Sequence, residues 1–211
     1  MSTFALPQKF QNWINKRNWG LHTHQIDVLT NSDRKSQLLI APTGSGKTLS
    51  GFLPTLIELD RLNFSGLHTI YVSPLKALAA DIKRNLMIPI EEMGLNIRVE
   101  DRTGDTTAKT KRRQRIDPPQ ILLTTPESLA LLISFPEANA LFANLERIII
   151  DEIHALVENK RGHQLLLAIS RLQSISKNLR KLGLSATVEH PKEIAGFISE
   201  NENKCPIIFA E

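Results

Sequence analysis

Residues 36–48 read SQLLIAPTGSGKT, and they constrain the architecture of the chain more strongly than any other segment. An apolar run ends in a loop with two glycines and a Lys-Thr pair, and a helical pattern follows from Leu49 to Arg61. Gly44 and Gly46 carry no Cβ, so the backbone can curl there and direct its N–H groups at an anion. A strand, a glycine loop and a helix in this order predict a phosphate-binding loop.

The polar residues of this loop predict a nucleotide site. Lys47 can place its ammonium on the β- and γ-phosphates, and Thr48, which opens the helix, can offer its hydroxyl to Mg²⁺. Ala41 stands where many such loops have their first glycine, and alanine is small enough to fit there. The nucleotide-binding residues that we expect here are Thr43, Gly44, Ser45, Gly46, Lys47 and Thr48.

Length and composition limit the classes of protein to consider. The chain has 211 residues, a formal net charge of +4 and one cysteine, Cys205. This length suits one sizeable α/β core, and a lone cysteine provides neither a disulfide framework nor a cysteine-based zinc site. The mild positive charge permits nucleic-acid binding without demonstrating it. Residues 1–10 lack the pattern of a signal peptide and no apolar run could span a bilayer, so we expect a cytoplasmic protein without membrane partners.

Apolar runs alternate with helical patterns along the rest of the chain. The predicted strands that follow the first one are His68–Ser73, Asn96–Glu100, Gln120–Thr124, Arg147–Asp151, Arg180–Ser185 and Pro206–Phe209. The other predicted helices are Pro7–Asn18, Gln25–Thr30, Leu75–Glu92, Thr106–Ile116, Pro126–Ile133, Arg161–Ser174 and His190–Ser199. Nearly continuous apolar strands in such an alternation predict one α/β domain with a mostly parallel sheet and helices on both faces. Ligands of such sheets bind at the carboxyl ends of the strands.

The segment IIIDEIH, residues 148–154, supplies the second chemical motif. Its isoleucines predict a buried strand, and the two acids stand at the tip of that strand. Asp151 can hold Mg²⁺, usually through water, and Glu152 can orient or deprotonate an attacking water. His154 can relay the state of the nucleotide, although a lone histidine is equally often a packing or surface residue.

Gln25 lies a short distance before the phosphate-binding loop. Its amide offers both a donor and an acceptor, as the edge of adenine requires. Taken alone, it is more often a plain surface glutamine. Thr23 is the expected cap of the helix that contains it.

Polar residues follow three further predicted strands, in the segments SPLK (73–76), RTGDT (102–106) and TTPES (124–128). Each offers hydroxyl and backbone N–H groups of the kind that contact nucleic-acid phosphates, and each alone would be an ordinary helix cap. Because they follow strands of the same predicted sheet, we expect a row along a nucleic-acid strand. A basic cluster is either a nucleic-acid patch or a solvated helix face; it consists of Lys109, Lys111, Arg112, Arg113 and Arg115.

Taken together, these motifs resemble those of superfamily 2 helicases. The resemblance rests on APTGSGKT at residues 41–48, DEIH at 151–154 and SAT at 185–187. The segments SPLKALAAD, RTGDT, TTPESL and DEIHALVENKRG resemble the large helicase-related (Lhr) group, and HQIDVL and GFLPTLIEL its bacterial branch, the DEXH helicases associated with DNA ligase. The resemblance extends from about Trp19 to Phe197.

This resemblance implies a RecA-like P-loop domain and an ATP-driven translocase on single-stranded or partly duplex DNA, often in DNA repair, with a DNA ligase and a nuclease as partners. ATP and Mg²⁺ are the implied cofactors. Gln25 would read adenine, Lys47 and Thr48 would serve phosphate and metal, and Asp151 and Glu152 would hold metal and activate water, which makes Lys47, Asp151 and Glu152 the catalytic set. Ser185 and Thr187, with His154, would couple hydrolysis to movement. The residues expected along the DNA are Pro74, Lys76, Thr103, Gly104, Thr125 and Pro126.

Helicases of this class have two RecA-like domains, and the second supplies arginines to the γ-phosphate. We expect residues 1–211 to be the first such domain, with residues 1–30 as a helical segment on the adenine side and the second domain lying outside this chain. Two alternatives stay open, an RNA helicase domain and a nucleotide switch module that binds ATP without translocating. Nothing in the sequence reads a base or a 2′-hydroxyl, so it does not separate RNA from DNA.

Overall fold

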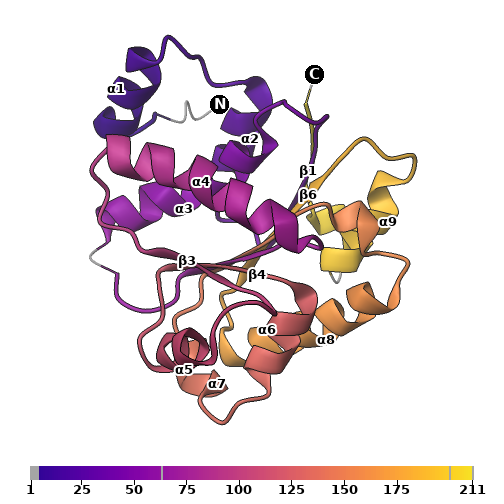
Figure 1. Cartoon of the computed structure of the whole chain (residues 1–211). Coiled ribbons are helices and arrows are strands. Elements are labelled where there is room, and N and C mark those ends of the chain that lie inside the picture. The colour runs from indigo at the N-terminus through magenta and orange to yellow at the C-terminus, as the bar shows by residue number, and fades with distance from the viewer. Residues whose placement is uncertain (1–4, 63, 200, 211) are drawn as a thin grey trace.

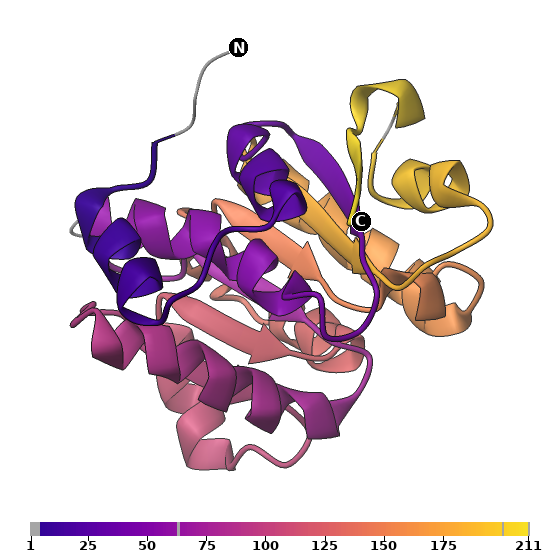
Figure 2. The same cartoon turned by 90° about the horizontal axis from the view of Figure 1, so that it is seen from above.

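The computed structural model describes residues 5–62, 64–199 and 201–210, with the side chains of residues 76–80 and 202 outside that description. Within it, seven strands form one sheet in which every neighbouring pair runs parallel. The strands are β1 (Ser36–Ile40), β2 (Thr69–Val72), β3 (Val99–Arg102), β4 (Ile121–Thr124), β5 (Arg147–Ile150), β6 (Arg180–Ser185) and β7 (Ile207–Phe209). Their order is β3-β4-β2-β5-β6-β1-β7, which places β7 at the edge beside β1 (Figure 2). The predicted α/β class and parallel sheet are confirmed.

Helices cover both faces of this sheet, with α1 to α4 above it and α6 to α8 below it in Figure 1. None of the described helices is both long and apolar enough to cross a bilayer. The α-helices are α1 (Gln8–Lys16), α2 (Thr23–Thr30), α3 (Lys47–Arg61), α4 (Lys76–Glu92), α5 (Ala108–Ile116), α6 (Pro126–Ile133), α7 (Ala138–Leu141), α8 (Lys160–Ile175) and α9 (Pro191–Ile198). Two short 3₁₀ turns are η1 (Ile153–Ala155) and η2 (Glu202–Lys204).

The apolar strands are buried on both faces because successive side chains point in opposite directions. In β5, the side chain of Ile149 belongs to the core between the sheet and α1 to α4. The side chains of Ile148 and Ile150 belong to the core between the sheet and α6 to α9. In β1, Leu39 faces the first core and Leu38 the second. This double burial explains why the strands read as continuous apolar runs rather than alternating ones.

Some local expectations are wrong. The N-cap of α2 is His22, whose extended backbone precedes the helix, and Thr23 is already its first residue. The backbone N–H of His22 donates to Oε1 of Gln25 at 3.0 Å, so the side chain of Gln25 fixes the start of the helix. Strand β3 is shifted toward the C-terminus relative to the predicted Asn96–Glu100 and ends at Arg102. Helix α7 was not predicted, because four residues are too few to show a helical period.

The carboxyl ends of the strands meet along one edge in close register. Thr124 at the end of β4 pairs with Arg102 of β3 and with Val72 of β2. Val72 in turn pairs with Ile150 of β5. The edge therefore has two adjoining parts: the ends of β3, β4 and β2, which we call the outer half, and the ends of β5, β6 and β1, which we call the inner half.

A buried charge cluster connects α3 to the amino-terminal ends of β5 and β6, on the side of the sheet away from the carboxyl edge. Arg147 is 1% exposed and donates from Nη2 to Oε1 of Glu58 at 2.8 Å. Arg180 donates to both carboxylate oxygens of Glu58, at 2.8 and 2.9 Å, and His68 Nε2 lies 3.4 Å from Oε2. Burial alone would raise the pKa of Glu58, but His68 and the two arginines outweigh it and hold this pKa well below its usual range.

Candidate nucleotide and nucleic-acid sites

Two glycines shape the loop between β1 and α3. Gly44 and Gly46 have φ angles of 85° and 80°, a left-handed conformation that residues with a Cβ rarely adopt. Gly46 is the N-cap of α3, and Lys47 is its first residue. A Cβ on Gly46 would stand 2.9 Å from Nε2 of Gln25, so the loop also requires glycine there for space. The first N–H groups of α3 have no partner within the helix, which suits them to bind phosphate.

Lys47 and Glu152 meet across the inner half of the edge. Lys47 is 8% exposed, and its Nζ lies 3.1 Å from Oε1 of Glu152. Glu152 has φ 46° and ψ 42°, a left-handed backbone that is uncommon for a residue with a side chain. Such strain costs on the order of 1–3 kcal/mol and concentrates at functional sites. The candidate phosphate-binding cation and the candidate base therefore share one location.

Asp151 stands at the end of β5, where its backbone N–H donates to the carbonyl of Val72 at 2.8 Å. Burial raises the pKa of its carboxyl group; the charge of Glu152 adds to the rise, and the charge of Lys47 acts in the opposite direction. Tyr71 lies beneath this site, stacked on Phe52 with the ring centroids 4.9 Å apart. Its buried hydroxyl has no hydrogen-bond partner within 3.5 Å among the described residues, and burial, followed by the charge of Asp151, raises the pKa of Tyr71 well above its usual value.

The residues at the end of β5 and the start of α3 fit a magnesium-bound nucleotide. Thr48 and Asp151 line the same cavity and offer oxygen atoms, the ligand type that Mg²⁺ prefers. In the described part of the chain, no group of three or more His, Cys, Asp or Glu side chains could hold a metal by itself. Phosphate oxygens would have to complete the coordination, which is the usual arrangement for Mg²⁺ with nucleotides.

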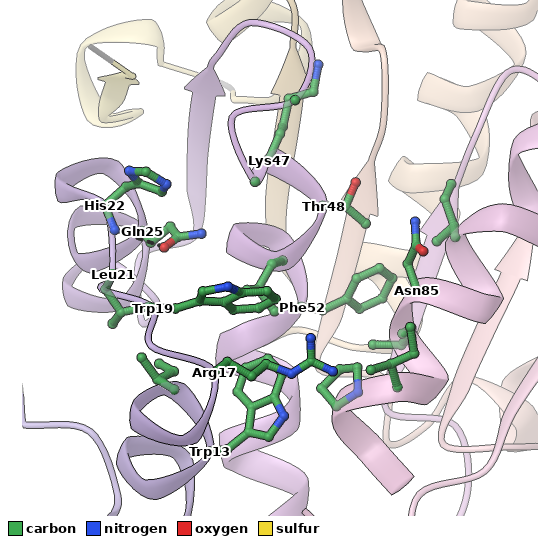
Figure 3. Close-up of a pocket in the computed structure, with 18 of the residues that line it drawn as sticks. Trp13, Arg17, Trp19, Leu21, His22, Gln25, Lys47, Thr48, Phe52 and Asn85 are labelled. Atoms are coloured by element: carbon green, nitrogen blue, oxygen red, sulfur yellow. Dashed lines mark hydrogen bonds between the residues drawn. The ribbon is translucent and has the colours of Figure 1, made fainter. Parts of the chain in front are cut away.

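A cavity of about 840 Å³ extends from the phosphate-binding loop to α1 and α4 (Figure 3). At one end it is lined by Lys47, Thr48, Asp151 and Glu152, together with Thr43, Gly44 and Gly46 of the loop. Figure 3 shows Trp13 and Trp19 at the other end, away from Lys47. The remaining lining includes the apolar residues Leu49, Phe52, Ile82, Leu86 and Pro89. A charged end beside an apolar end is the combination that a nucleotide requires, with phosphates at the first and the base toward the second.

Gln25 lines this cavity beside the loop, as Figure 3 shows. It is 3% exposed, so the interpretation as a surface glutamine is wrong. Oε1 already accepts the N–H of His22, and a carbonyl oxygen retains a second lone pair for another donor. His24 supports the loop from below, because its Nε2 lies 3.1 Å from the carbonyl oxygen of Ser45. Burial, followed by the charge of His22, lowers the pKa of His24.

An aromatic cluster closes the apolar end of the cavity (Figure 3). The guanidinium carbon of Arg17 lies 4.8 Å from the ring centroid of Trp19 and 5.5 Å from that of Trp13. Glu92 of α4 accepts from Nε of Arg17 at 2.8 Å and from Nε1 of Trp13 at 2.6 Å. The hydrogen bond to Glu92 raises the pKa of Arg17 above its usual value. This cluster holds α1 against α4 and fixes the width of the cavity.

The structure brings together two of the three residues that we expect to couple hydrolysis to movement. Nδ1 of His154 lies 3.2 Å from Oγ of Ser185 and 3.5 Å from Oε2 of Glu152. Thr187 is exposed and has no hydrogen bond within the described residues. His154 therefore joins the end of β6 to the candidate base, and Thr187 takes no part in this contact.

The expected nucleic-acid residues lie along the outer half of the edge. Thr125 is the N-cap of α6 and accepts from the N–H of Ser128 at 3.3 Å, so the plain cap interpretation holds for it. Thr103 is nearly buried, whereas Gly104 is exposed. The side chain of Lys76 lies outside the described part of the structure. The ends of three adjacent strands carry the expected residues Pro74, Thr103, Gly104, Thr125 and Pro126. Their contact with nucleic acid stays a prediction.

The basic cluster of α5 is largely engaged within the protein. Nζ of Lys111 donates to the carbonyl of Gly104 at 2.9 Å, and Arg113 pairs with Glu100 and Asp117. The guanidinium of Arg115 lies 4.1 Å above the ring of Phe135. Lys109 and Arg112 are exposed. These contacts favour a structural helix face over a free nucleic-acid patch.

Sequence reasoning missed several residues of these sites. His24 stands next to Gln25 in the sequence and could have been suspected from that position. Tyr71 is embedded in an apolar strand, where an aromatic residue signals only burial. Arg161 donates from Nη2 to the carbonyl of Pro74 at 2.8 Å, and the two residues are 87 positions apart. A contact between residues so far apart in the sequence leaves no local sequence pattern from which it could be predicted.

The family model for DEAD/DEAH box helicases matches residues 22–194. The ATP-dependent helicase Lhr-Core of Methanocaldococcus jannaschii is 43% identical over 189 residues, which cover 82% of this chain and 22% of the relative. The Lhr helicase/probable uracil glycosylase of Mycolicibacterium smegmatis is 42% identical over 182 residues, covering 80% of this chain and 12% of the relative.

Among solved structures, Mycobacterium smegmatis helicase Lhr bound to ssDNA and AMP-PNP has a TM-score of 0.87 and 35% identity, covering 97% of this chain and 28% of that one. The DUF1998 helicase MrfA bound to DNA has a TM-score of 0.83 and 26% identity, covering 97% of this chain and 29% of that one. The chain thus spans about a fifth or less of the length of the curated relatives described above. The predicted resemblance to superfamily 2 and the Lhr group is confirmed, while the ligase-associated branch stays a prediction. With the family model matching most of its length, the chain belongs to the DEAD/DEAH box helicase family.

Proposed function

We propose that this chain is the ATP-binding motor domain of an ATP-dependent helicase that moves along single-stranded DNA. The observation that carries the proposal is the division of the carboxyl edge into two adjoining halves. The inner half holds Lys47, Asp151 and Glu152 around one cavity. The outer half holds the row of polar loops. A parallel sheet places both ligands at the same edge, so nucleotide and nucleic acid would bind side by side.

At the inner half, each residue would act on ATP in a defined way. Lys47 would leave Glu152 to bind the β- and γ-phosphates, which frees the carboxylate of Glu152 to orient or deprotonate water. Thr48 and Asp151 would hold Mg²⁺, which supplies positive charge to the phosphate oxygens when it is bound. The amide of Gln25 would contact the edge of adenine.

At the outer half, backbone N–H groups and hydroxyls would contact phosphates rather than bases. Binding would therefore be independent of base sequence and sensitive to salt. We favour DNA over RNA because the Lhr relative was solved with ssDNA, and MrfA with DNA. A second RecA-like domain, a role in DNA repair, and ligase and nuclease partners are further proposals that rest on the family resemblance alone. A cytoplasmic location is a proposal that rests on the sequence pattern of residues 1–10 and on the lack of a long apolar run.

The nucleotide part is tested by calorimetric titration of residues 1–211 with Mg²⁺-ADP and Mg²⁺-ATP. Lys47→Ala removes a charge-assisted contact to phosphate and should lose about 1.5–3 kcal/mol of binding free energy. Lys192→Ala, an exposed lysine on α9, is the matched control and should bind like wild type. Equal affinity in wild type and Lys47→Ala would contradict the assignment of the phosphate site.

The nucleic-acid part is tested by fluorescence anisotropy with single-stranded DNA and RNA of several sequences. We expect weak binding that falls steeply as the salt concentration rises from about 50 to 200 mM, alike for all sequences. Lys76→Ala should weaken binding to every sequence by a similar factor. A strong preference for one base order would oppose the phosphate-tracking row, and a clear preference for RNA would oppose DNA as the substrate.

A further inference from the structure

Arg161, in the first turn of α8, connects the segment that follows β2 with the segment that follows β4. Both segments belong to the outer half of the edge. Nε and Nη2 donate to the two carboxylate oxygens of Glu127, and Nη2 also donates to the carbonyl of Pro74 at 2.8 Å. Glu127 lies directly after Thr125 and Pro126 at the start of α6, and Pro74 follows β2. One guanidinium thus holds two of the three loops of the proposed nucleic-acid row.

The position of Arg161 works against helix stability. The first turn of α8 carries Lys160 and Arg161 and no acidic residue. The N-terminus of a helix has a partial positive charge, so cations there are unfavourable and acids favourable. An arginine at this place is explained by its contacts with Glu127 and Pro74 rather than by local stabilisation of α8. The hydrogen bond from Arg161 is also the main cause that lowers the pKa of Glu127.

The segment before Arg161 leads directly back to the nucleotide site. Asp151 and Glu152 are followed by η1 and then by Leu156, which is fully buried. A Cβ on Gly162 would stand 1.8 Å from the carbonyl oxygen of Leu156, so the backbone of α8 touches this segment with no room for any side chain. Asn159 closes the contact by accepting from the N–H of Gly162 at 3.0 Å. A displacement at Glu152 would therefore be passed to the start of α8.

We propose that Arg161 is a positioning residue that couples the nucleotide site to the nucleic-acid row. When the segment from Glu152 to Leu156 shifts with the nucleotide, α8 follows through Gly162, and Arg161 moves the loops at Pro74 and Glu127 together. Its guanidinium matches this task because it forms a planar fork that can bind a carboxylate and a carbonyl at once. Arg161 itself contacts neither nucleotide nor nucleic acid in this scheme. The proposal rests on the proposed function.

The test measures single-stranded DNA affinity with and without AMP-PNP in the full-length protein. Coupling between two ligands typically amounts to about 5- to 150-fold. We expect the DNA affinity of wild type to differ between the presence and the absence of AMP-PNP by a factor in this range. In Arg161→Ala this factor should fall by at least about 5-fold, or to one where the wild-type factor is itself below about 5. AMP-PNP affinity without DNA should stay as in wild type. Arg171→Ala, an exposed arginine on the same helix, is the matched control and should keep the wild-type ratio.

Two further variants separate positioning from a direct phosphate contact. Arg161→Lys keeps the charge but loses the fork, so it should resemble Arg161→Ala if Arg161 positions the loops. A direct phosphate contact would instead be rescued by lysine, and Arg161→Ala would reduce the salt slope of DNA binding by about one. Glu127→Gln combined with Arg161→Ala should be no worse than Arg161→Ala alone, because both remove the same tie.

The outcomes distinguish this proposal from the proposed function. Wild type that binds neither AMP-PNP nor single-stranded DNA would overturn the proposed function. Wild type that binds both without any effect of one on the other would overturn the coupling role while leaving both sites intact. A wild-type coupling ratio in Arg161→Ala, or rescue by Arg161→Lys, would overturn the role of Arg161 alone.

Discussion

At the scale of single residues, Glu152 combines a left-handed backbone with an ion pair to Lys47. Glu152→Gln removes the carboxylate that would orient or deprotonate water and keeps nearly the same shape. In the full-length protein we expect this variant to bind ATP with wild-type affinity or better, because Lys47 is released, and to lose most of its steady-state turnover. Glu158→Gln, on an exposed neighbour, is the control. Hydrolysis by Glu152→Gln at the wild-type rate would place the base elsewhere.

Asp151 should behave differently from Glu152, although the two are adjacent. Asp151→Asn would remove a proposed metal ligand, so both the rate and its dependence on Mg²⁺ should change. The measurement is ATPase rate against Mg²⁺ concentration: we expect Asp151→Asn to require more Mg²⁺ for half-maximal rate, and Glu152→Gln to keep the wild-type requirement in its residual activity. An unchanged Mg²⁺ requirement in Asp151→Asn would remove Asp151 from the metal site.

Gly162 can pack against the backbone of Leu156 because it has no side chain. In Gly162→Ala the new Cβ would collide with the carbonyl oxygen of Leu156, which is backbone and cannot turn away. We expect a loss of about 1–3 kcal/mol in the free energy of unfolding, measured with urea. Gly196→Ala is the control, since a Cβ there meets nothing within 4 Å and alanine in a helix gains about 0.5–1 kcal/mol over glycine. Equal stability of both variants would show that the contact at Leu156 is not close-packed.

At the scale of elements, Glu58 on α3 compensates the charges of Arg147 and Arg180 on β5 and β6. Glu58→Gln would leave the fully buried Arg147 without its counter-charge, and breaking such a pair typically costs about 3–5 kcal/mol. Because the folded pKa of Glu58 is depressed, its contribution is present above the unfolded pKa of about 4.3 and is lost as the pH falls below it. Urea unfolding between about pH 7 and pH 3 should therefore show a smaller acid-induced loss in Glu58→Gln than in wild type. Glu91→Gln, on an exposed glutamate of α4, should keep the wild-type pH dependence.

The elements themselves could be predicted well from the sequence, whereas their side-chain contacts could not. Strands buried on both faces leave continuous apolar runs such as Ile148–Ile150, and the turn residues between them mark where each ends. The short helix α7 was not predicted because a single turn leaves no period to detect. The cap at His22 was assigned to Thr23 because threonine is a preferred N-cap residue and histidine is not. Tyr71 and Arg161 contact residues that are distant in sequence, Phe52 and Pro74 respectively, and only the fold brings these residues together.

At the scale of the whole molecule, the charge around the phosphate site is incomplete for rapid hydrolysis. Among the side chains that the structure describes, Lys47 and Arg17 are the Lys or Arg residues that line the cavity; Lys47 lies at the phosphate end, and Arg17 is held by Glu92 at the other end. A further arginine at the γ-phosphate is worth about 10³–10⁵ in rate in related nucleotide hydrolases. We expect residues 1–211 alone to hydrolyse ATP far more slowly than the full-length protein, each with excess single-stranded DNA. DNA-stimulated turnover at the full-length rate would show that this domain needs no second one.

All seven described strands, from β3 at one edge of the sheet to β7 at the other, are joined by hydrogen bonds, which makes the sheet rigid. Neighbouring strands in such a sheet are held about 4.8 Å apart by a regular series of hydrogen bonds, and a close-packed core on each face resists compression. The inner and outer halves of the edge therefore cannot slide past one another to produce a stroke. Under the proposed function, this domain would stay rigid, and a step along DNA would require the movement of another domain relative to it. A conformational change that passes from the inner half to the outer half must therefore be transmitted by side-chain contacts outside the sheet, such as those of Arg161.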